Sequence, residues 1–338
     1  MALHPALSGD LQGDWQGDWQ SNPQGQFQQR LAHLQSALPQ HADKPNETVR
    51  ATLHALWHLA SGSALSVVCA QQLALPALDS PGLARLDALI ARRLSGVPLA
   101  HLSQRQHFMD LEMLAGPEAL IPRLETEQLG RAAATLMHSI QGQQITPAPK
   151  VLDLCCGSGN LALALAHHAP HANVWGSDVS AAAIDLAKRN ASHLGLSGRV
   201  GFRVGDLFQP FDEACFIGQI DLLVCNPPYI SSAKINTLPA EIQAHEPRAA
   251  LDGGPLGVNL LRRFLREAPQ FLRPGGWLAL EVGHGQGHSV MHYLRAMNQG
   301  HTSTASASAQ STPAFEAPIG AENASGDIRV VMARLAAH

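Results

Sequence analysis

The chain has 338 residues, of which 45% are hydrophobic and 15% charged, and its formal net charge is −4. This length is enough for about two ordinary domains with substantial cores. No apolar run reaches the roughly twenty residues that a membrane span needs, so no membrane segment is expected. The negative charge disfavours extensive phosphate contacts, and no direct sequence-specific nucleic-acid binding is expected.

The amino terminus and the cysteines indicate a reducing compartment. The start, Met1-Ala2-Leu3-His4, lacks the basic and apolar segments of a secretory signal, so a cytoplasmic location is expected. The five cysteines are an odd number and lie mostly within apolar runs, which favours free thiols over disulfides. No cysteine–histidine spacing matches a zinc site, and we expect no metal.

The first third of the chain divides by composition. Residues 1–28 are rich in Gln, Gly and Asp and repeat the sequence Gly-Asp-Trp-Gln, which predicts a disordered low-complexity tail. Apolar residues such as Leu53 and Leu56 recur at helical spacing through 29–95, which predicts a small helical domain. We expect this domain to dock the substrate. Glycine and proline then break the helical pattern, and we expect 96–124 to form a β-hairpin linker.

Helices and short apolar strands alternate through 125–338, which is typical of an α/β fold with a doubly wound parallel sheet. Residues 299–325 are rich in Ser, Thr, Ala and Pro and are expected to be a flexible insertion. If this insertion leads into a hairpin, the last strand runs antiparallel to the others. The predicted strands are Lys150–Leu154, Asn173–Ser177, Val200–Val204, Ile220–Cys225, Trp277–Val282 and Ile328–Arg334.

Three of the predicted strands end in residues suited to a nucleoside. Asp178 follows the second strand, where a carboxylate can hold a ribose diol, because Ser180 is the better cap for the next helix. Asp206 and Leu207 follow the third strand and offer an acid and an apolar side chain to an adenine. The first strand runs into a loop whose glycines let a ligand approach the backbone closely, Cys155-Cys156-Gly157-Ser158-Gly159.

The fourth strand ends in a short run that suits an amino or amide nitrogen. In Asn226-Pro227-Pro228-Tyr229 the prolines stop the ladder of hydrogen bonds and leave carbonyls free at the ligand-binding edge of the sheet. The Asn226 side chain and a proline carbonyl can accept both hydrogens of a planar NH₂ group, on which Tyr229 can stack. Together with the three earlier strand ends, this run predicts a site that binds S-adenosylmethionine (SAM) and methylates such a nitrogen.

From about Arg93 onward the chain resembles the HemK family of glutamine N5-methyltransferases. The resemblance includes the motifs above and further segments at Gly96–His101, Leu120–Glu127, His245–Gly254, Leu272–Trp277 and Ile328–Arg334. It implies a Rossmann-like class I SAM-dependent methyltransferase sheet, preceded by a helical domain and a hairpin.

The resemblance also implies roles for single residues. It implies that residues 155–159 contact the methionine and ribose of SAM, that Asp178 binds the ribose and that Asp206 and Leu207 flank the adenine. Residues 226–229, Asn226 to Tyr229, would hold the substrate amide for a single in-line methyl transfer.

Two protein substrates remain open from the sequence. Residues 245–254 look more like the family branch that methylates the Gly-Gly-Gln loop of peptide-chain release factors. The cysteine pair at 155–156 and the segment 205–208 look more like the branch that methylates a ribosomal protein. Two other functions also remain open, an adenine-amino methyltransferase acting on nucleic acid and a non-catalytic SAM-binding protein. A monomer with a protein substrate is expected.

Overall fold

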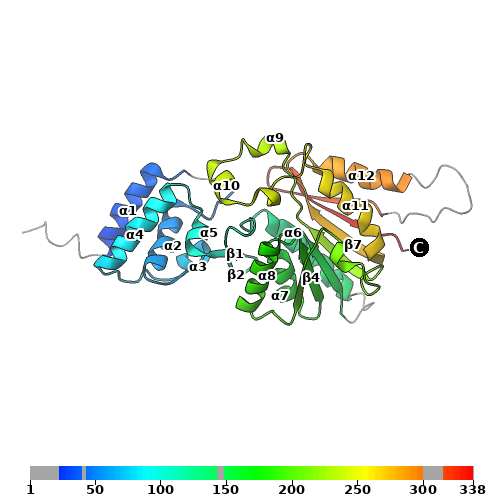
Figure 1. Cartoon of the computed structure of the whole chain (residues 1–338), viewed down its shortest axis with the longest axis horizontal. Coiled ribbons are helices and arrows are strands. Elements are labelled where there is room, and N and C mark those ends of the chain that lie inside the picture. Colours follow the sequence, from blue (N-terminus) through cyan, green and yellow to red (C-terminus); the bar gives the residue numbers. More distant parts are fainter. Residues whose placement is uncertain (1–22, 40–42, 143–147, 300–314, 338) are drawn as a thin grey trace, which may run out of the picture.

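The computed structural model describes residues 23–39, 43–142, 148–299 and 315–337. An amino-terminal group of helices adjoins a larger α/β domain that is built on a seven-stranded sheet (Figure 1). Most of the tail expected at 1–28 lies outside the described residues. Within the described ranges, no helix is both long and apolar enough to cross a membrane.

The amino-terminal helices pack around Trp57, which is fully buried. The expectation of disorder through residue 28 is wrong for its last residues, because the first helix begins at Pro23 and buries Phe27 against Trp57, with ring centroids 5.7 Å apart. The helices are α1 (Pro23–Ala37), α2 (Val49–Ala60), α3 (Val67–Gln71), α4 (Ser80–Leu94) and α5 (Leu99–Ser103).

A short antiparallel hairpin connects the two parts of the chain. It consists of β1 (Arg105–Phe108) and β2 (Leu111–Leu114), and it lies within the segment expected to be a hairpin linker. Met109 and Asp110 form its two-residue turn with φ angles of 44° and 67°. Positive φ at both turn residues matches the right-handed twist of the flanking strands. The short helix α5 precedes the hairpin and was not expected from the sequence.

The central sheet has the strand order β5-β4-β3-β6-β7-β9-β8. The first five strands in this order are parallel, and β9 pairs antiparallel with both β7 and β8. This confirms the antiparallel last strand. The expected insertion at 299–325 was too long, because β8 lies inside it. The strands are β3 (Lys150–Leu154), β4 (Asn173–Asp178), β5 (Val200–Val204), β6 (Ile220–Cys225), β7 (Leu272–Glu281), β8 (Ile319–Glu322) and β9 (Ile328–Arg334).

Helices cover both faces of the sheet (Figure 1). Alternate residues along a strand enter different cores, so that Val151 packs with α6 and α7 while Leu152 packs with α11 and α12. The flanking helices are α6 (Thr126–Gly142), α7 (Asn160–His168), α8 (Ala181–His193), α11 (Asn259–Phe271) and α12 (Gly287–Gln299). This arrangement is the Rossmann-like class I methyltransferase fold.

After β6 the chain forms the short helices α9 (Ser232–Ile235) and α10 (Ala240–His245), and α10 reaches the amino-terminal helices (Figure 1). Glu241 of α10 accepts a 2.8 Å hydrogen bond from Arg93 of α4 and another from Lys44. All three side chains are buried. A buried cluster of charges therefore connects the two parts of the molecule.

Candidate functional site

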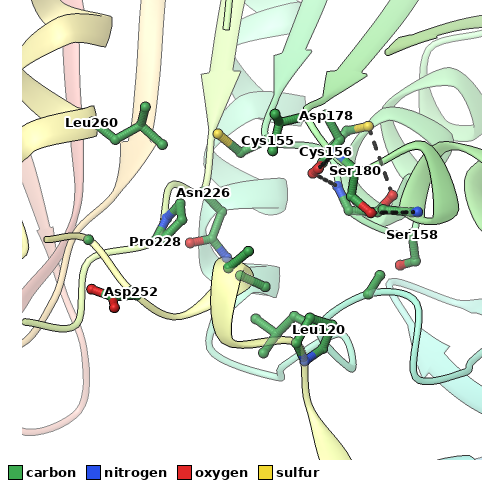
Figure 2. A pocket seen from close by; sticks show the side chains of 18 of the residues that line it. Leu120, Cys155, Cys156, Ser158, Asp178, Ser180, Asn226, Pro228, Asp252 and Leu260 are labelled. Carbon is green, nitrogen blue, oxygen red and sulfur yellow. Dashed lines mark hydrogen bonds between the residues drawn. The ribbon is translucent and has the colours of Figure 1, made fainter. Parts of the chain in front are cut away.

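A cavity of about 480 Å³ opens at the carboxyl ends of β3, β4 and β6, with the segment after β5 on one side. This cavity, called the larger cavity below, lies where parallel α/β sheets bind ligands. Figure 2 shows Ser158, Asp178 and Ser180 on one side of it and Asn226, Pro228 and Asp252 on the other. The four strand ends that were singled out in the sequence therefore meet at one site.

The loop after β3 brings four of its five predicted residues to the larger cavity, Cys155, Cys156, Gly157 and Ser158. Cys155 and Gly157 have φ angles of 59° and 52°, which turn the backbone sharply towards the cavity. Gly159 does not line the cavity. It precedes α7 with φ 81°, and a Cβ atom there would lie 2.8 Å from the Phe202 ring. The fifth residue therefore packs the loop against β5.

Two thiols near this loop, Cys156 and Cys225, are poor nucleophiles. Burial raises the pKa of both Cys156 and Cys225 well above the ordinary value, so that these side chains remain protonated. A thiolate, rather than a thiol, attacks an electrophile. Within the described ranges, no group of three or more histidine, cysteine or acidic side chains could hold a metal ion.

Asp178 lies at the end of β4 and borders the larger cavity. Its Oδ2 accepts a hydrogen bond of 3.0 Å from the Gly157 amide, and its Oδ1 accepts one of 2.9 Å from the Ser180 amide. Burial raises the pKa of this carboxyl, and these amide hydrogen bonds oppose the rise. Ser180 caps α8 through the Ala183 amide, as predicted. Each carboxylate oxygen has two lone pairs, so Asp178 can still accept hydrogen bonds from a ligand.

Asp206 and Leu207 border the same cavity after β5. The Asp206 carboxylate is paired with Arg263 of α11, whose Nη1 lies 3.0 Å from Oδ2 and 3.2 Å from Oδ1. This partner was not foreseen from the sequence. Leu207 is buried and has a φ angle of 49°. An apolar side chain and a paired acid therefore stand side by side at this end of the cavity.

The residues of Asn226-Pro227-Pro228-Tyr229 lie between two cavities. Asn226 and Pro228 line the larger one, and all four line a smaller one of about 170 Å³. The Asn226 Nδ2 donates a 3.1 Å hydrogen bond to Thr126 Oγ1. The Tyr229 hydroxyl donates one of 3.0 Å to Glu281 Oε1. The tetrapeptide is thus a wall that both cavities share, and its two polar side chains are held from behind.

A glycine-rich loop fixes the backbone of the tetrapeptide. A Cβ atom on Gly253 would lie 2.5 Å from the Pro228 carbonyl oxygen, and one on Gly257 would lie 2.2 Å from that of Tyr229. Only glycine permits such close approach of two backbones. Gln286 also donates a 3.2 Å hydrogen bond to the Tyr229 carbonyl. The shared wall is therefore rigid.

Known proteins resemble this chain across the sheet domain. A family model described as a methyltransferase domain matches residues 145–311. The release factor glutamine methyltransferase of Moorella thermoacetica is 42% identical over 208 residues, which are 62% of this chain and 70% of that protein. That of Geobacter sulfurreducens is 41% identical over 214 residues, 63% of this chain and 70% of the relative.

The chain belongs to the release factor glutamine methyltransferase family. A relative named for another substrate is the ribosomal protein uL3 glutamine methyltransferase of Bradyrhizobium diazoefficiens. It is 35% identical over 209 residues, which are 60% of this chain and 62% of the relative. The resemblance to the HemK family is thus confirmed, and both branches that the sequence indicated occur among the relatives.

The sequence analysis did not identify three side chains that contact the predicted site residues. Thr126 begins α6, Glu281 ends β7 and Arg263 lies on α11. Two of them carried a signal: Glu281 is an acid at the end of a buried strand, and Thr126 lies in the segment Leu120–Glu127 that resembles the family. Thr126 lies 100 residues from its partner Asn226 in the chain, and no spacing rule connects such positions.

Proposed function

We propose that this protein transfers a methyl group from SAM to the side-chain amide nitrogen of a glutamine in a translation protein. We further propose that this glutamine belongs to the Gly-Gly-Gln loop of a peptide-chain release factor. The observation that carries the proposal is the rigid wall of Asn226 to Tyr229, which lines the larger cavity on one side and the smaller cavity on the other. Such a wall can place a donor and an acceptor next to each other.

The residues of the larger cavity fit SAM. Asp178 has acceptor capacity left for ribose hydroxyls, the loop at 155–158 exposes backbone to the ligand, and Leu207 offers an apolar surface to adenine. When bound, SAM supplies an electrophilic methyl group. Cys156 contributes a neutral, buried side chain to this cavity, and we assign no covalent role to the cysteine pair.

The acceptor amide is held by two oxygen atoms of the wall. Because the Asn226 Nδ2 donates to Thr126, the Oδ1 atom remains available to accept from a substrate N–H. No described residue donates a hydrogen bond to the Pro227 carbonyl, which can accept the second N–H. These two acceptors fix the amide nitrogen and increase its electron density as charge develops. Orientation of this kind can lower a barrier by about 7–11 kcal/mol.

The smaller cavity fits the acceptor side chain. Its volume of about 170 Å³ is enough for one side chain. Pro228 and Tyr229 form one side of it, and Ile242 and Leu251 contribute apolar surface. A ribosomal protein is the second candidate substrate, since one relative carries that name.

In the decisive experiment, the protein is incubated with labelled SAM and either purified release factors or ribosomal subunits. The labelled residue is then mapped by mass spectrometry. We expect label on the glutamine of the Gly-Gly-Gln loop. Label on a ribosomal protein would instead select the second substrate, and label on adenine or on no acceptor would refute glutamine methylation.

A variant at the wall tests the roles assigned to it. We expect Asn226→Ala to lower turnover by about 10²–10³-fold, the effect of removing one preorganised hydrogen-bonding group. SAM binding, measured by calorimetry, should fall much less. The matched control is Asn236→Ala, because Asn236 is exposed after α9 and lines neither cavity. Equal losses of binding and turnover in Asn226→Ala would contradict this division of roles.

A further inference from the structure

Three polar side chains, two of them buried, form a chain of contacts at the shared wall. Asn226 at the end of β6 contacts Thr126 at the start of α6, and Thr126 in turn lies close to Glu281 at the end of β7. Thr126 and Glu281 are each only 2% exposed. None of these contacts is made by neighbours in sequence, so the fold itself has assembled them.

The hydrogen bonds of this chain have a direction. An ionised carboxylate can only accept, so Glu281 receives the Tyr229 hydroxyl on Oε1 at 3.0 Å. Thr126 is the other hydroxyl close to this carboxyl, whose Oε2 has no hydrogen-bond partner among the described residues, so in this contact the hydroxyl can only be the donor. The oxygen of Thr126 is then left as an acceptor, and Asn226 supplies an N–H to it at 3.1 Å.

Arg329 favours the ionised state of Glu281. Its Nη2 lies 4.0 Å from Glu281 Oε1 and 3.1 Å from Glu125 Oε2, and its Nε donates a 2.9 Å hydrogen bond to the Val282 carbonyl. Burial raises the pKa of Glu281, while the hydrogen bonds of Thr126 and Tyr229 and the charge of Arg329 oppose the rise. The guanidinium is thus fixed beside the carboxylate.

We propose that Glu281 and Thr126 are positioning residues that fix the orientation of the Asn226 amide and so make the site select an N–H donor over a carboxylate. This inference rests on the proposed function. With Nδ2 directed to Thr126, the side-chain oxygen of Asn226 is left for the acceptor. A glutamine amide donates to that oxygen, whereas a glutamate carboxylate is repelled by it.

Reversal of the amide would reverse this preference. If the Asn226 amide turned over, its NH₂ group would face the acceptor, bind a carboxylate and lose the ability to accept from glutamine. Valine at 126 is nearly isosteric with threonine but has no hydroxyl, so it leaves the Asn226 NH₂ without a partner. A buried donor without a partner costs about 1–3 kcal/mol, which favours the turned amide.

The test compares two peptides that differ only in the acceptor residue, one with Gly-Gly-Gln and one with Gly-Gly-Glu. For each variant, kcat and KM are measured with the glutamine peptide, the inhibition constant with the glutamate peptide, and the SAM affinity by calorimetry. The variants are Thr126→Val, Thr126→Ser, which keeps the hydroxyl, and Glu281→Gln, which can donate as well as accept. Thr135→Val is the matched control, because Thr135 is exposed on the same helix.

We expect Thr126→Val to lower kcat/KM for the glutamine peptide by about 10-fold or more and to bind the glutamate peptide more tightly than the wild type does. Glu281→Gln should also lower kcat/KM for the glutamine peptide and strengthen binding of the glutamate peptide, each by severalfold. Thr126→Ser should keep the wild-type preference for the glutamine peptide. SAM affinity should stay within about threefold throughout, which shows that each variant is folded.

Two outcomes separate the proposals. If the wild-type protein methylates glutamine but Thr126→Val loses activity without any gain in affinity for the glutamate peptide, the orientation mechanism is wrong and the proposed function stands. If the wild type methylates neither the peptide nor an intact release factor or ribosomal protein, the proposed function is wrong and this inference falls with it.

Discussion

The buried charge cluster between the two parts of the molecule is expected to be a major source of stability. Glu241 is paired with Arg93 and Lys44, and all three side chains are less than one-tenth exposed. Glutamine at 241 keeps the size of the side chain but leaves two buried cations. Removing one partner of a buried pair costs about 3–5 kcal/mol. Glu47 lies 3.6 Å from Arg93 and compensates in part, so we expect about 3 kcal/mol for Glu241→Gln.

Urea titration followed by circular dichroism measures this loss as a change in the free energy of unfolding. The matched control is Asp87→Asn, which breaks a 2.7 Å pair with Arg30 within the amino-terminal helices. Asp87 is 57% exposed, and an exposed pair contributes less than about 1 kcal/mol. Adding Arg93→Met to Glu241→Gln should recover part of the loss, because one of the two uncompensated cations is then gone.

The pH dependence gives a second test of the same pair. Burial by itself would raise the pKa of Glu241, but the hydrogen bonds and charges of Lys44 and Arg93 together hold it below its ordinary value of 4.5. A lowered pKa stabilises the folded state above the unfolded-state pKa, and this stabilisation disappears as the pH falls through the folded-state pKa. The gap between wild type and Glu241→Gln should therefore narrow below pH 4.5. A loss no larger than that of Asp87→Asn at pH 7 would refute the reasoning.

Three further changes test the sheet domain. Burial raises the pKa of Asp153 from 3.8 to about 8, so the free energy of unfolding should fall by about 1.4 kcal/mol for each unit that the pH rises between these values. Urea titrations of Asp153→Asn across this range should show a weaker dependence of stability on pH than the wild type does. An equal dependence would contradict this. Gly159→Ala forces a Cβ atom to 2.8 Å from Phe202 at φ 81°, and we expect a loss of about 2 kcal/mol, which an unchanged denaturation midpoint would disprove. Asp178→Asn should weaken SAM binding about 10-fold or more in calorimetry, whereas Asp185→Asn on the exposed face of α8 should not; equal affinities of the two variants would count against ribose binding by Asp178.

The sequence predicted most of the central strands well because burial on both faces gives them continuous apolar runs, although β7 begins at Leu272 and not at the predicted Trp277. All six residues of β6 are buried, and its predicted ends agree with the structure. β8 was missed because it is a short edge strand with Ile319 half exposed, and its composition resembles that of the preceding segment. The beginning of α1 was missed because glutamine-rich sequence gives no apolar stripe, although Phe27 anchors it.

The candidate site was predictable where a residue follows a strand and not where it reaches the site from elsewhere. Parallel strands bring their carboxyl ends to one edge, so the strand pattern alone places Asp178, Asp206 and Asn226 together. It does not place their partners. Arg263 reaches Asp206 from a helix 57 positions further along, and Thr126 precedes Asn226 by 100. Which lone pairs of a carboxylate or amide remain for a ligand depends on such partners.

Donor binding and acceptor selection should be separable in this protein. Asp178 borders the larger cavity and hydrogen-bonds to the loop after β3, whereas Glu281 borders the smaller cavity and holds Tyr229. Asn226 alone among these three lines both cavities. A change at Asp178 should therefore alter SAM affinity with little effect on the choice of acceptor, and a change at Glu281 should do the reverse. If Asp178→Asn altered the preference between glutamine and glutamate peptides as strongly as Glu281→Gln does, the shared wall would be a single coupled unit, and the assignment of Asn226 orientation to Glu281 would fail.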